Sequence, residues 1–266
     1  MNALYFRIFL LSFLLATGPV YGQIAYKYHF KRISSKEGNF PGKLKKGDEF
    51  GAGIALIGDL DGDGISELAV GARLDDDGGT DQGAVWILFM DKDASVRRAQ
   101  KISFKEGGFL GQLSPGGQFG SAIAAMGDLN GDTLPDIAVS EPMASVGGLR
   151  NGRVWILHLN RDGTVKSHTA ISNTEGGFTG KLGTDHQFGR GLVSLGDMDG
   201  DSIPELAVGA PMQDRVGPGS LWILFLNRDG SVKREQKIGD GAGGFTAKLR
   251  MADFFGVSVD LLGDLD

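Results

Sequence analysis

The fold of this chain is set by one stretch, Asp59-Leu60-Asp61-Gly62-Asp63-Gly64-Ile65-Ser66-Glu67, which places oxygen-bearing side chains at loop positions one, three, five and nine. The same pattern returns in residues 128–136 and 197–205, and a fourth copy begins at residues 263–266, where the sequence stops. Oxygen ligands that alternate along a tight loop suit a hard cation, above all calcium. We therefore expect a repeated calcium loop, with the rest of the chain as its repeated scaffold.

The loops belong to a longer internal repeat. The pairs Phe50-Gly51, Phe119-Gly120 and Phe188-Gly189 are spaced 69 residues apart, and Phe255-Gly256 follows 67 residues later. Three tryptophans, at positions 86, 155 and 222, keep nearly the same step. A period of this length is typical of an array of supersecondary units that stack on one another.

Each repeat contains four short apolar or alternating runs separated by loops rich in Gly, Asp and Asn, which is the pattern of strands joined by turns. The expected strands are 52–57, 67–72, 84–90 and 96–103 in the first repeat; 121–126, 136–140, 153–159 and 165–172 in the second; and 190–195, 205–210, 220–226 and 232–238 in the third. No window shows a helical apolar stripe. The chain is therefore predicted to be all-β.

The four strands of a repeat differ in character. The first is built from small residues, the third is bulky throughout, and the fourth is polar and basic. Small inner strands, bulky middle strands and charged outer strands are typical of the four-stranded antiparallel blades of a β-propeller. The turns at 91–94, 160–163 and 227–230 join the third and fourth strands, and we expect no metal role for them.

The paired motifs resemble the FG-GAP repeats of the integrin alpha-subunit β-propeller and of secreted bacterial proteins. Phe188-Gly189 is followed 21 residues later by Gly209-Ala210-Pro211, and Phe50-Gly51 by Gly71-Ala72-Arg73. The second repeat departs from the motif, with Ser140-Glu141-Pro142. The resemblance covers residues 31–266, with repeats at 31–103, 104–172, 173–238 and, in part, 239–266. It implies a propeller that closes with further blades.

In that family the loop joins the inner two strands of a blade and binds calcium. Carried over by position, the resemblance implies three complete sites and the beginning of a fourth. They comprise Asp59, Asp61, Asp63, Ile65 (by its carbonyl) and Glu67; Asp128, Asn130, Asp132, Leu134 (carbonyl) and Asp136; Asp197, Asp199, Asp201, Ile203 (carbonyl) and Glu205; and Asp264 with Asp266. Glutamate at position nine of two loops departs from the family's usual aspartate. The second site, with Asn130, has one charge fewer and is expected to bind more weakly.

The acidic loops have two alternative interpretations. An EF-hand begins similarly but needs a bidentate glutamate at its twelfth position, where this chain has Val70, Val139 and Val208. The EF-hand is therefore rejected. The other alternative is a set of aspartate-rich turns without metal, although so many like charges in one loop repel each other strongly unless a cation is bound.

The N-terminus has the pattern of an export signal. Arg7 precedes an apolar run over residues 8–16, and Val20-Tyr21-Gly22 offers small residues before a cut at Gln23. We expect a signal peptide over 1–22, a mature chain over 23–266 without a transmembrane span, and a secreted or cell-surface location. A single membrane anchor is the alternative, but the apolar run is short for it.

The composition narrows the classes of function that this chain can have. Thirteen of the 33 acidic residues lie in the loops, so the net charge of −6 is local to them, and no basic run suggests nucleic acid. Cysteine is absent, which excludes a catalytic thiol or a disulfide framework. The four histidines do not repeat, and no catalytic motif is found. His158 replaces Phe89 and Phe225 and is interpreted as a tolerated substitution, while His186 lies in a loop that could face a ligand.

Two loop types per repeat are candidates for recognition. They are 73–83, 142–152 and 211–219 between the second and third strands, and 104–118, 173–187 and 239–253 between repeats. The resemblance implies that both lie opposite the calcium loops. The leading hypothesis is a secreted calcium-binding propeller, not an enzyme, that binds an extracellular protein or glycan in adhesion.

Two further readings stay open. One is an accessory propeller of an exported hydrolase or lyase, and the other is a purely structural surface protein. The ending inside a metal motif suggests a fragment, which is expected to form an open arc of blades.

Overall fold

The computed structural model describes residues 4–5, 31–212 and 216–263, and every regular element in this part of the chain is a strand. A two-residue strand β1 (Leu4–Tyr5) pairs with β2 (Arg32–Ile33). Apart from Leu4–Tyr5, the expected signal peptide over 1–22 lies outside the described residues, as do Asp264 and Asp266. Across the described ranges there is no helix of the length and apolarity needed to cross a bilayer.

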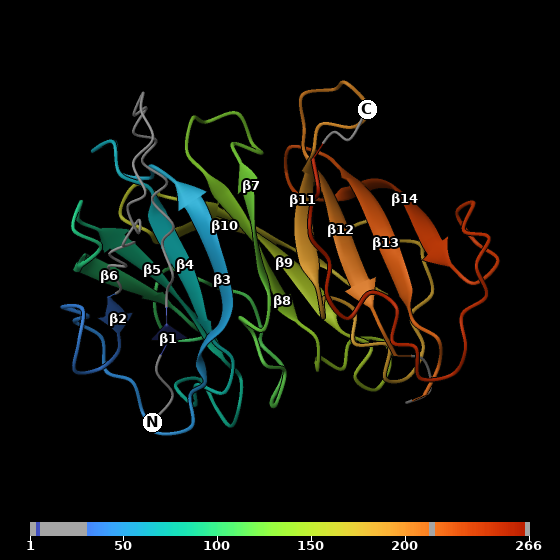
Figure 1. The fold of residues 1–266 in the computed structure, drawn as a ribbon, viewed down its shortest axis with the longest axis horizontal. Coiled ribbons are helices and arrows are strands. Elements are labelled where there is room, and N and C mark those ends of the chain that lie inside the picture. Colours follow the sequence, from blue (N-terminus) through green and yellow to red (C-terminus); the bar gives the residue numbers. More distant parts are fainter. Residues whose placement is uncertain (1–3, 6–30, 213–215, 264–266) are drawn as a thin grey trace, which may run out of the picture.

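The remaining strands form three sheets of four, each antiparallel and in chain order (Figure 1). The first contains β3 (Phe50–Gly58), β4 (Glu67–Ala72), β5 (Ala84–Met90) and β6 (Val96–Ile102); the second β7 (Ile123–Gly127), β8 (Asp136–Glu141), β9 (Arg153–Leu159) and β10 (Val165–Ile171); the third β11 (Leu192–Gly196), β12 (Glu205–Ala210), β13 (Ser220–Leu226) and β14 (Val232–Gly239). The expected all-β propeller of four-stranded blades is thus confirmed.

Burial follows the expected roles of the strands. The two middle strands of each blade are buried along almost their whole length, whereas the outer strands β6, β10 and β14 are buried at their ends and accessible between them. The inner strands β3, β7 and β11 lie beside one another in turn. The three blades do not close on themselves and form an open arc (Figure 1).

Two inner strands begin later than the sequence suggests. The expected strands start at Ser121 and Arg190, but β7 and β11 start two residues further on. The backbone of Ser121 is tied back to Gln118, and that of Arg190 to Gln187, by turn hydrogen bonds of 3.2 and 3.1 Å. Each of these residues closes a turn that contains the Phe-Gly pair, and the regular strand begins after it.

The Phe-Gly and Gly-Ala motifs meet where neighbouring blades touch. A Cβ added to Gly71 would lie 1.9 Å from the carbonyl oxygen of Gly120. A Cβ added to Gly209 would clash with the carbonyl oxygen of Gly256 in the same way. Gly120 also has a φ of +89°, a left-handed backbone conformation that favours glycine. The phenylalanines are anchors as expected, because Phe119 and Phe188 are fully buried. Glycine in both motifs therefore allows blade backbones to approach closely.

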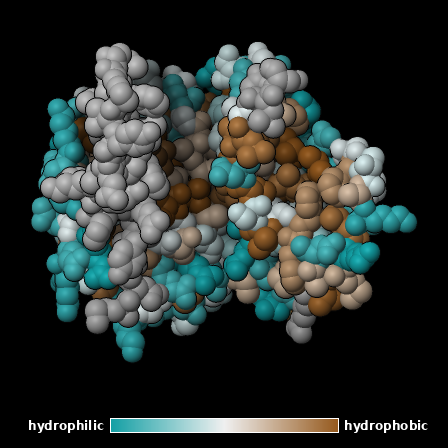
Figure 2. Space-filling view, in the orientation of Figure 1, coloured by the Kyte–Doolittle hydropathy of each residue, from teal (hydrophilic) through white to brown (hydrophobic). Residues whose placement is uncertain are grey.

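Apolar clusters join the blades in sequence. One cluster links the first and second blades and another links the second and third, with Trp155 and Trp222 among their members. A smaller cluster of Ala207, Ile223 and Phe225 lies on the third blade, where neighbouring apolar residues are only partly covered. Figure 2 shows this hydrophobic surface over the third blade and in the hollow between the blades.

Candidate metal centre

The first aspartate of each loop organises the turn between the inner two strands. In the β3–β4 loop the carboxylate of Asp59 accepts hydrogen bonds from the backbone N–H groups of Gly62, Asp63 and Gly64 at 2.7–3.1 Å. These hydrogen bonds, that of Gly64 first, lower the pKa of Asp59. Gly62 and Gly64 have φ values of +87° and +83°, as the expected tight turn requires. Asp128 and Asp197 make the same three hydrogen bonds in their loops.

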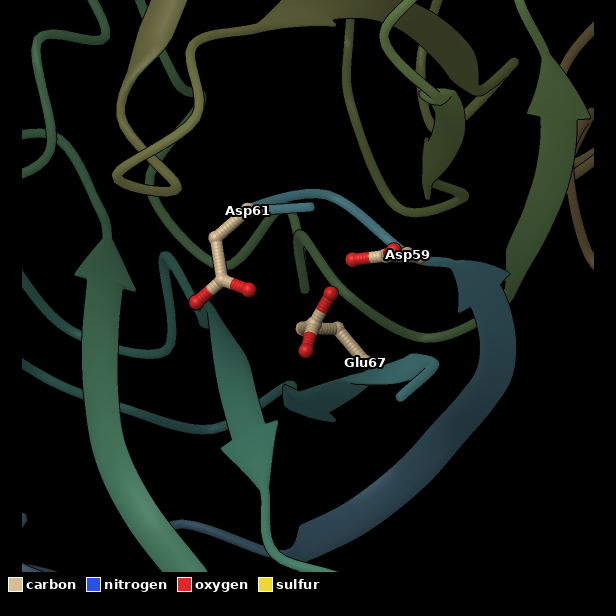
Figure 3. A group of neighbouring side chains, drawn as sticks. All are labelled: Asp59, Asp61 and Glu67. Carbon is tan, nitrogen blue, oxygen red and sulfur yellow. The ribbon is translucent and has the colours of Figure 1, made fainter. Parts of the chain in front are cut away.

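Three carboxylates of the first loop converge. Asp59, Asp61 and Glu67 each place an oxygen within 4.8 Å of the others, and Figure 3 shows their carboxylates pointing toward one another. Glu67 begins β4 and is fully buried. Its Oε2 accepts a hydrogen bond from the Leu60 N–H at 2.6 Å, but no described group donates to its Oε1. Burial, with the charges of Asp61, Asp63 and Asp59, raises the pKa of Glu67 to about 7.

The third loop repeats this geometry. Asp197, Asp199 and Glu205 form the second group of converging carboxylates. Oε2 of Glu205 accepts a 2.5 Å hydrogen bond from the Met198 N–H, while within the described chain its Oε1 has no donor. An unsatisfied buried carboxylate oxygen is costly. Hard oxygen ligands around it are the donor set that a calcium or magnesium ion uses, so the residues of both loops fit a divalent cation.

The second loop is built differently. Its ninth residue, Asp136, is fully buried, but both of its oxygens have donors, including Leu159 N–H at 3.2 Å to Oδ1 and Leu129 N–H at 3.2 Å to Oδ2. His158 Nδ1 lies 3.0 Å from the same Oδ2. Burial opposes a charge on the imidazole, but the hydrogen bond and charge of Asp136 outweigh it and raise the pKa of His158.

The role of His158 was missed by sequence reasoning, which took it as a tolerated substitution. A signal was present in the sequence, because His158 stands where the other blades have Phe89 and Phe225, and it does so in the repeat whose loop has Asp136 in place of Glu67 and Glu205. These two exchanged positions are the ones that meet in the structure.

Basic residues of the outer strands reach into the loops. Arg97 lies 2.7 Å from Asp63 and 2.8 Å from Asp61, and Lys166 and Lys233 lie 2.8 Å from Asp132 and Asp201, their loops' fifth residues. Position five therefore faces a cation of the chain itself rather than the converging carboxylates. Sequence reasoning treated these residues only as an exposed edge. The available signal was that Arg97, Lys166 and Lys233 occupy one repeated position.

The turns between the third and fourth strands lie close to the loop of the preceding blade. Arg98 of the first blade donates hydrogen bonds to the carbonyls of Arg161 and Asp162 in the turn of the second blade, at 3.2 and 3.0 Å. Arg161 is also close enough to Asp59 to contribute to its lowered pKa. The turns thus provide positive charge next to the loops, which the expectation of tight turns alone did not include.

The seventh residues, Ile65, Leu134 and Ile203, anchor their loops by packing apolar side chains on the core clusters. Ligation through their carbonyls stays a prediction. Of the expected ligands, the residues at positions one, three and nine lie together in the first and third loops. The residue at position five forms an ion pair with a basic residue of the outer strand. Asp128 and Asp132 line the second loop, where Asp132 accepts hydrogen bonds from Asn130 and Lys166.

At the opposite end of the blades, the two expected recognition loops run together. Gly116 N–H and Phe119 N–H donate to the carbonyls of Thr80 and Gln82, and the loops around 149–151 and 185–188 pair in the same way. The acidic cluster in 73–83 is balanced within its own blade, because Asp75 and Asp77 hold the ammonium group of Lys101 at 3.0 and 3.4 Å. His186 is buried rather than displayed.

The departure of the second repeat from the Gly-Ala-Pro motif has a structural cause. Glu141 is fully buried and accepts hydrogen bonds from Arg153, opposite it on β9, and from the Trp155 indole N–H at 2.9 Å. Ser114 N–H donates to its other oxygen at 2.6 Å. The sister blades have Ala72 opposite Ala84 and Ala210 opposite Ser220. A charged pair with several donors thus replaces two small residues.

Comparison with known proteins agrees with this architecture. The FG-GAP repeat model matches residues 50–88, 119–157 and 188–224, which cover the inner three strands of each blade. The chain is 33% identical to integrin alpha-PS2 of Drosophila melanogaster over 64% of its length, 32% identical to integrin alpha-PS5 of the same organism over 77%, and 30% identical to human integrin alpha-7 over 69%. It spans 12%, 19% and 14% of the lengths of these relatives.

Four-stranded blades that meet through Phe-Gly and Gly-Ala contacts, with an acidic loop between the inner strands, define the class of propellers built from FG-GAP repeats. Within that class, the chain is an integrin-alpha-like FG-GAP protein.

Proposed function

We propose that this chain is an extracellular, calcium-braced propeller that recognises a protein or glycan ligand in adhesion. The observation that carries the calcium assignment is the buried, undonated Oε1 of Glu67, surrounded by Asp59 and Asp61, and its repetition at Glu205. Calcium binds roughly six to eight oxygens in flexible geometry, so water and the seventh-position carbonyls can complete its coordination.

The proposed calcium is a brace rather than a reactive centre. It neutralises carboxylates that otherwise repel one another across the turn between the two inner strands. The loop residues proposed as ligands remain those at positions one, three, five, seven and nine, with the converging carboxylates as the core of the first and third sites. When calcium binds, the position-five aspartate is released from its basic partner or shared with it.

Recognition is assigned to the other end of the blades. Several large apolar side chains are exposed in the loops between the second and third strands and between repeats, where Leu149 is 54% and Met251 is 72% exposed. Loops on a rigid scaffold commonly carry binding residues, and exposed apolar side chains favour a protein or glycan partner there. Leu110 and Val216, in the same two types of loop, are also exposed.

The accessory-propeller reading is the second candidate function. It is not favoured, because the relatives reported above, which match 64–77% of this chain, are integrin alpha chains. Sequence that continues the chain separates the two readings: further repeats and an anchor favour adhesion, whereas a catalytic motif favours the enzyme.

Calcium bracing is tested by thermal melting of the full chain in EGTA and in about 1 mM calcium, a concentration within the range of extracellular modules. Binding to the folded state alone raises the melting temperature. Magnesium at the same concentration is the control for ionic strength and is expected to stabilise less. Equal melting temperatures with calcium and with EGTA would sink the calcium assignment.

Export and recognition need separate measurements. The N-terminus of the exported chain, determined by mass spectrometry, is expected at Gln23; an intact N-terminus contradicts the signal peptide. Binding of the full chain to arrays of extracellular proteins and glycans is expected to fall in Leu149→Asp and Met251→Asp. Leu56→Asp, exposed on β3 away from these loops, is the matched control.

A further inference from the structure

Four equivalent positions change together between the blades. Two lie in the acidic loop, at positions three and nine, and two lie on the third and fourth strands of the same blade. The sets are Asp61, Glu67, Phe89 and Arg98 in the first blade; Asp199, Glu205, Phe225 and Arg234 in the third; and Asn130, Asp136, His158 and Ser167 in the second.

In the first and third blades the glutamate at position nine keeps a buried oxygen, Oε1, without a donor among the described residues, and in the first blade Oδ1 of Asp61 also has none. The guanidinium of Arg98 stacks 3.1 Å from the centre of the Phe89 ring, and that of Arg234 does the same with Phe225. Arg98 then reaches Asp61 at 3.4 Å. A phenylalanine has no hydrogen to donate to the glutamate of the loop. The Oε1 of Glu67 is therefore left for an external cation.

In the second blade the chain satisfies its own loop. His158 and three backbone N–H groups occupy both oxygens of Asp136. Asn130 Nδ2 and Lys166 Nζ both point at Oδ2 of Asp132, at 3.1 and 2.8 Å. No carboxylate oxygen of this loop is both buried and without a donor among the described residues. The amide of Asn130 also removes one negative charge.

From this difference, which rests on the proposed calcium function, we infer that the chain has two classes of loop. The first and third loops are tight calcium sites, whereas the second blade is braced by the buried Asp136–His158 pair and its loop binds calcium weakly. His158 acts as a positioning residue that holds Asp136 away from a cation. Calcium dependence is thus confined to the two blades that flank a self-braced one.

The test counts tight calcium ions by isothermal titration of the full chain, starting from EGTA-stripped and dialysed protein. Two tight ions are expected for the natural sequence. Glu205→Gln is expected to leave one, while Asp136→Asn is expected to keep two and to lower the melting temperature in EGTA. A purely structural role for both residues does not produce this split between ion number and melting temperature.

A swap of residues between blades tests the assignment in the opposite direction. The variant N130D/D136E/H158F/S167R gives the second blade the residues of its sisters and is expected to bind a third tight ion, an affinity gain of at least about 10-fold at that loop. The single variant N130D is the control, because charge alone is expected to leave two. Circular dichroism verifies folding of each variant, and Glu67→Gln replaces Glu205→Gln where the latter does not fold.

The outcomes distinguish failure of the proposed function from failure of this inference alone. A natural chain that binds no calcium overturns the proposed function together with this inference. Three ions of equal affinity, loss of a tight ion in Asp136→Asn, or a third tight ion in N130D alone overturn only the inference.

Discussion

The first and third blades end their second strand with Gly71-Ala72 and Gly209-Ala210, whereas the second blade ends it with Ser140-Glu141. The small residues allow the neighbouring backbone to approach closely. The second blade buries Glu141 instead and supplies Arg153 and Trp155 as donors. The acidic loop of the second blade follows the same rule, because buried Asp136 has its partner, His158, in the same blade.

This comparison teaches that substitutions in a repeat array occur as sets. A buried carboxylate is tolerated where the same blade provides its donors, because an unpaired buried charge is strongly destabilising. Blade two buries a carboxylate at two places, Asp136 and Glu141, and each carboxylate has its own donors in the same blade. Four predictions test this interpretation.

The largest effect is expected for Glu141→Ala. The change leaves Arg153 buried without its carboxylate, and the free energy of unfolding should fall by about 3–5 kcal/mol, as measured by urea denaturation. The double variant E141A/R153A copies the pair Ala72 and Ala84 of the first blade, and it should recover a large part of the loss. A single variant as stable as the natural chain contradicts the idea of paired substitution.

The next effect concerns close approach between blades. Gly71→Ala places a Cβ against the carbonyl oxygen of Gly120, and the overpacking should cost about 1–3 kcal/mol or more. Ser140→Ala, at the equivalent position of the second blade, creates no clash and should cost only about 0.5–1.5 kcal/mol, because it removes the hydroxyl that accepts a hydrogen bond from Ala122 N–H at 2.8 Å. Urea unfolding of both variants measures the difference, and equal costs would show that the approach is not limiting.

A pH effect is expected in the first blade. Because the pKa of Glu67 is raised to about 7, a proton on this group favours the folded state, and without calcium this contribution is lost as the pH rises from 4.5 toward 7. Calcium replaces the proton, so the rise in melting temperature caused by calcium should be larger at pH 8 than at pH 5.5. In Glu67→Gln the part of this pH dependence due to the first loop should disappear.

The smallest effect is expected at the exposed outer strand. Lys233→Gln removes a cation from Asp201 and Asp199 in the third loop. Solvent screens such pairs, so the melting temperature in EGTA should change little. Calcium affinity should rise slightly, and more at low salt than at high salt, in a titration. A clear loss of affinity would mean that Lys233 organises the site instead of competing with the cation.

Much of the fold could be predicted from the sequence. The strands at 67–72, 84–90, 153–159, 205–210 and 220–226 match β4, β5, β9, β12 and β13 residue for residue. These runs are buried on both faces, so their apolar character is continuous and their ends are marked by turns. The inner strands were predicted less closely, because Ser121 and Arg190 close turns by hydrogen bonds to Gln118 and Gln187, and β7 and β11 begin two residues later.

The sequence by itself determined the period, the strand order, the position of each acidic loop and the glycines at its turns, because these depend on local backbone preferences and on apolar patterning. The tertiary structure decided which oxygens converge and which are already satisfied. Asp63 forms an ion pair with Arg97, and Glu141 forms one with Arg153. Asp136 lies within hydrogen-bond distance of His158. Such partners are distant in the chain and meet only when the strands pack, so no local pattern reveals them.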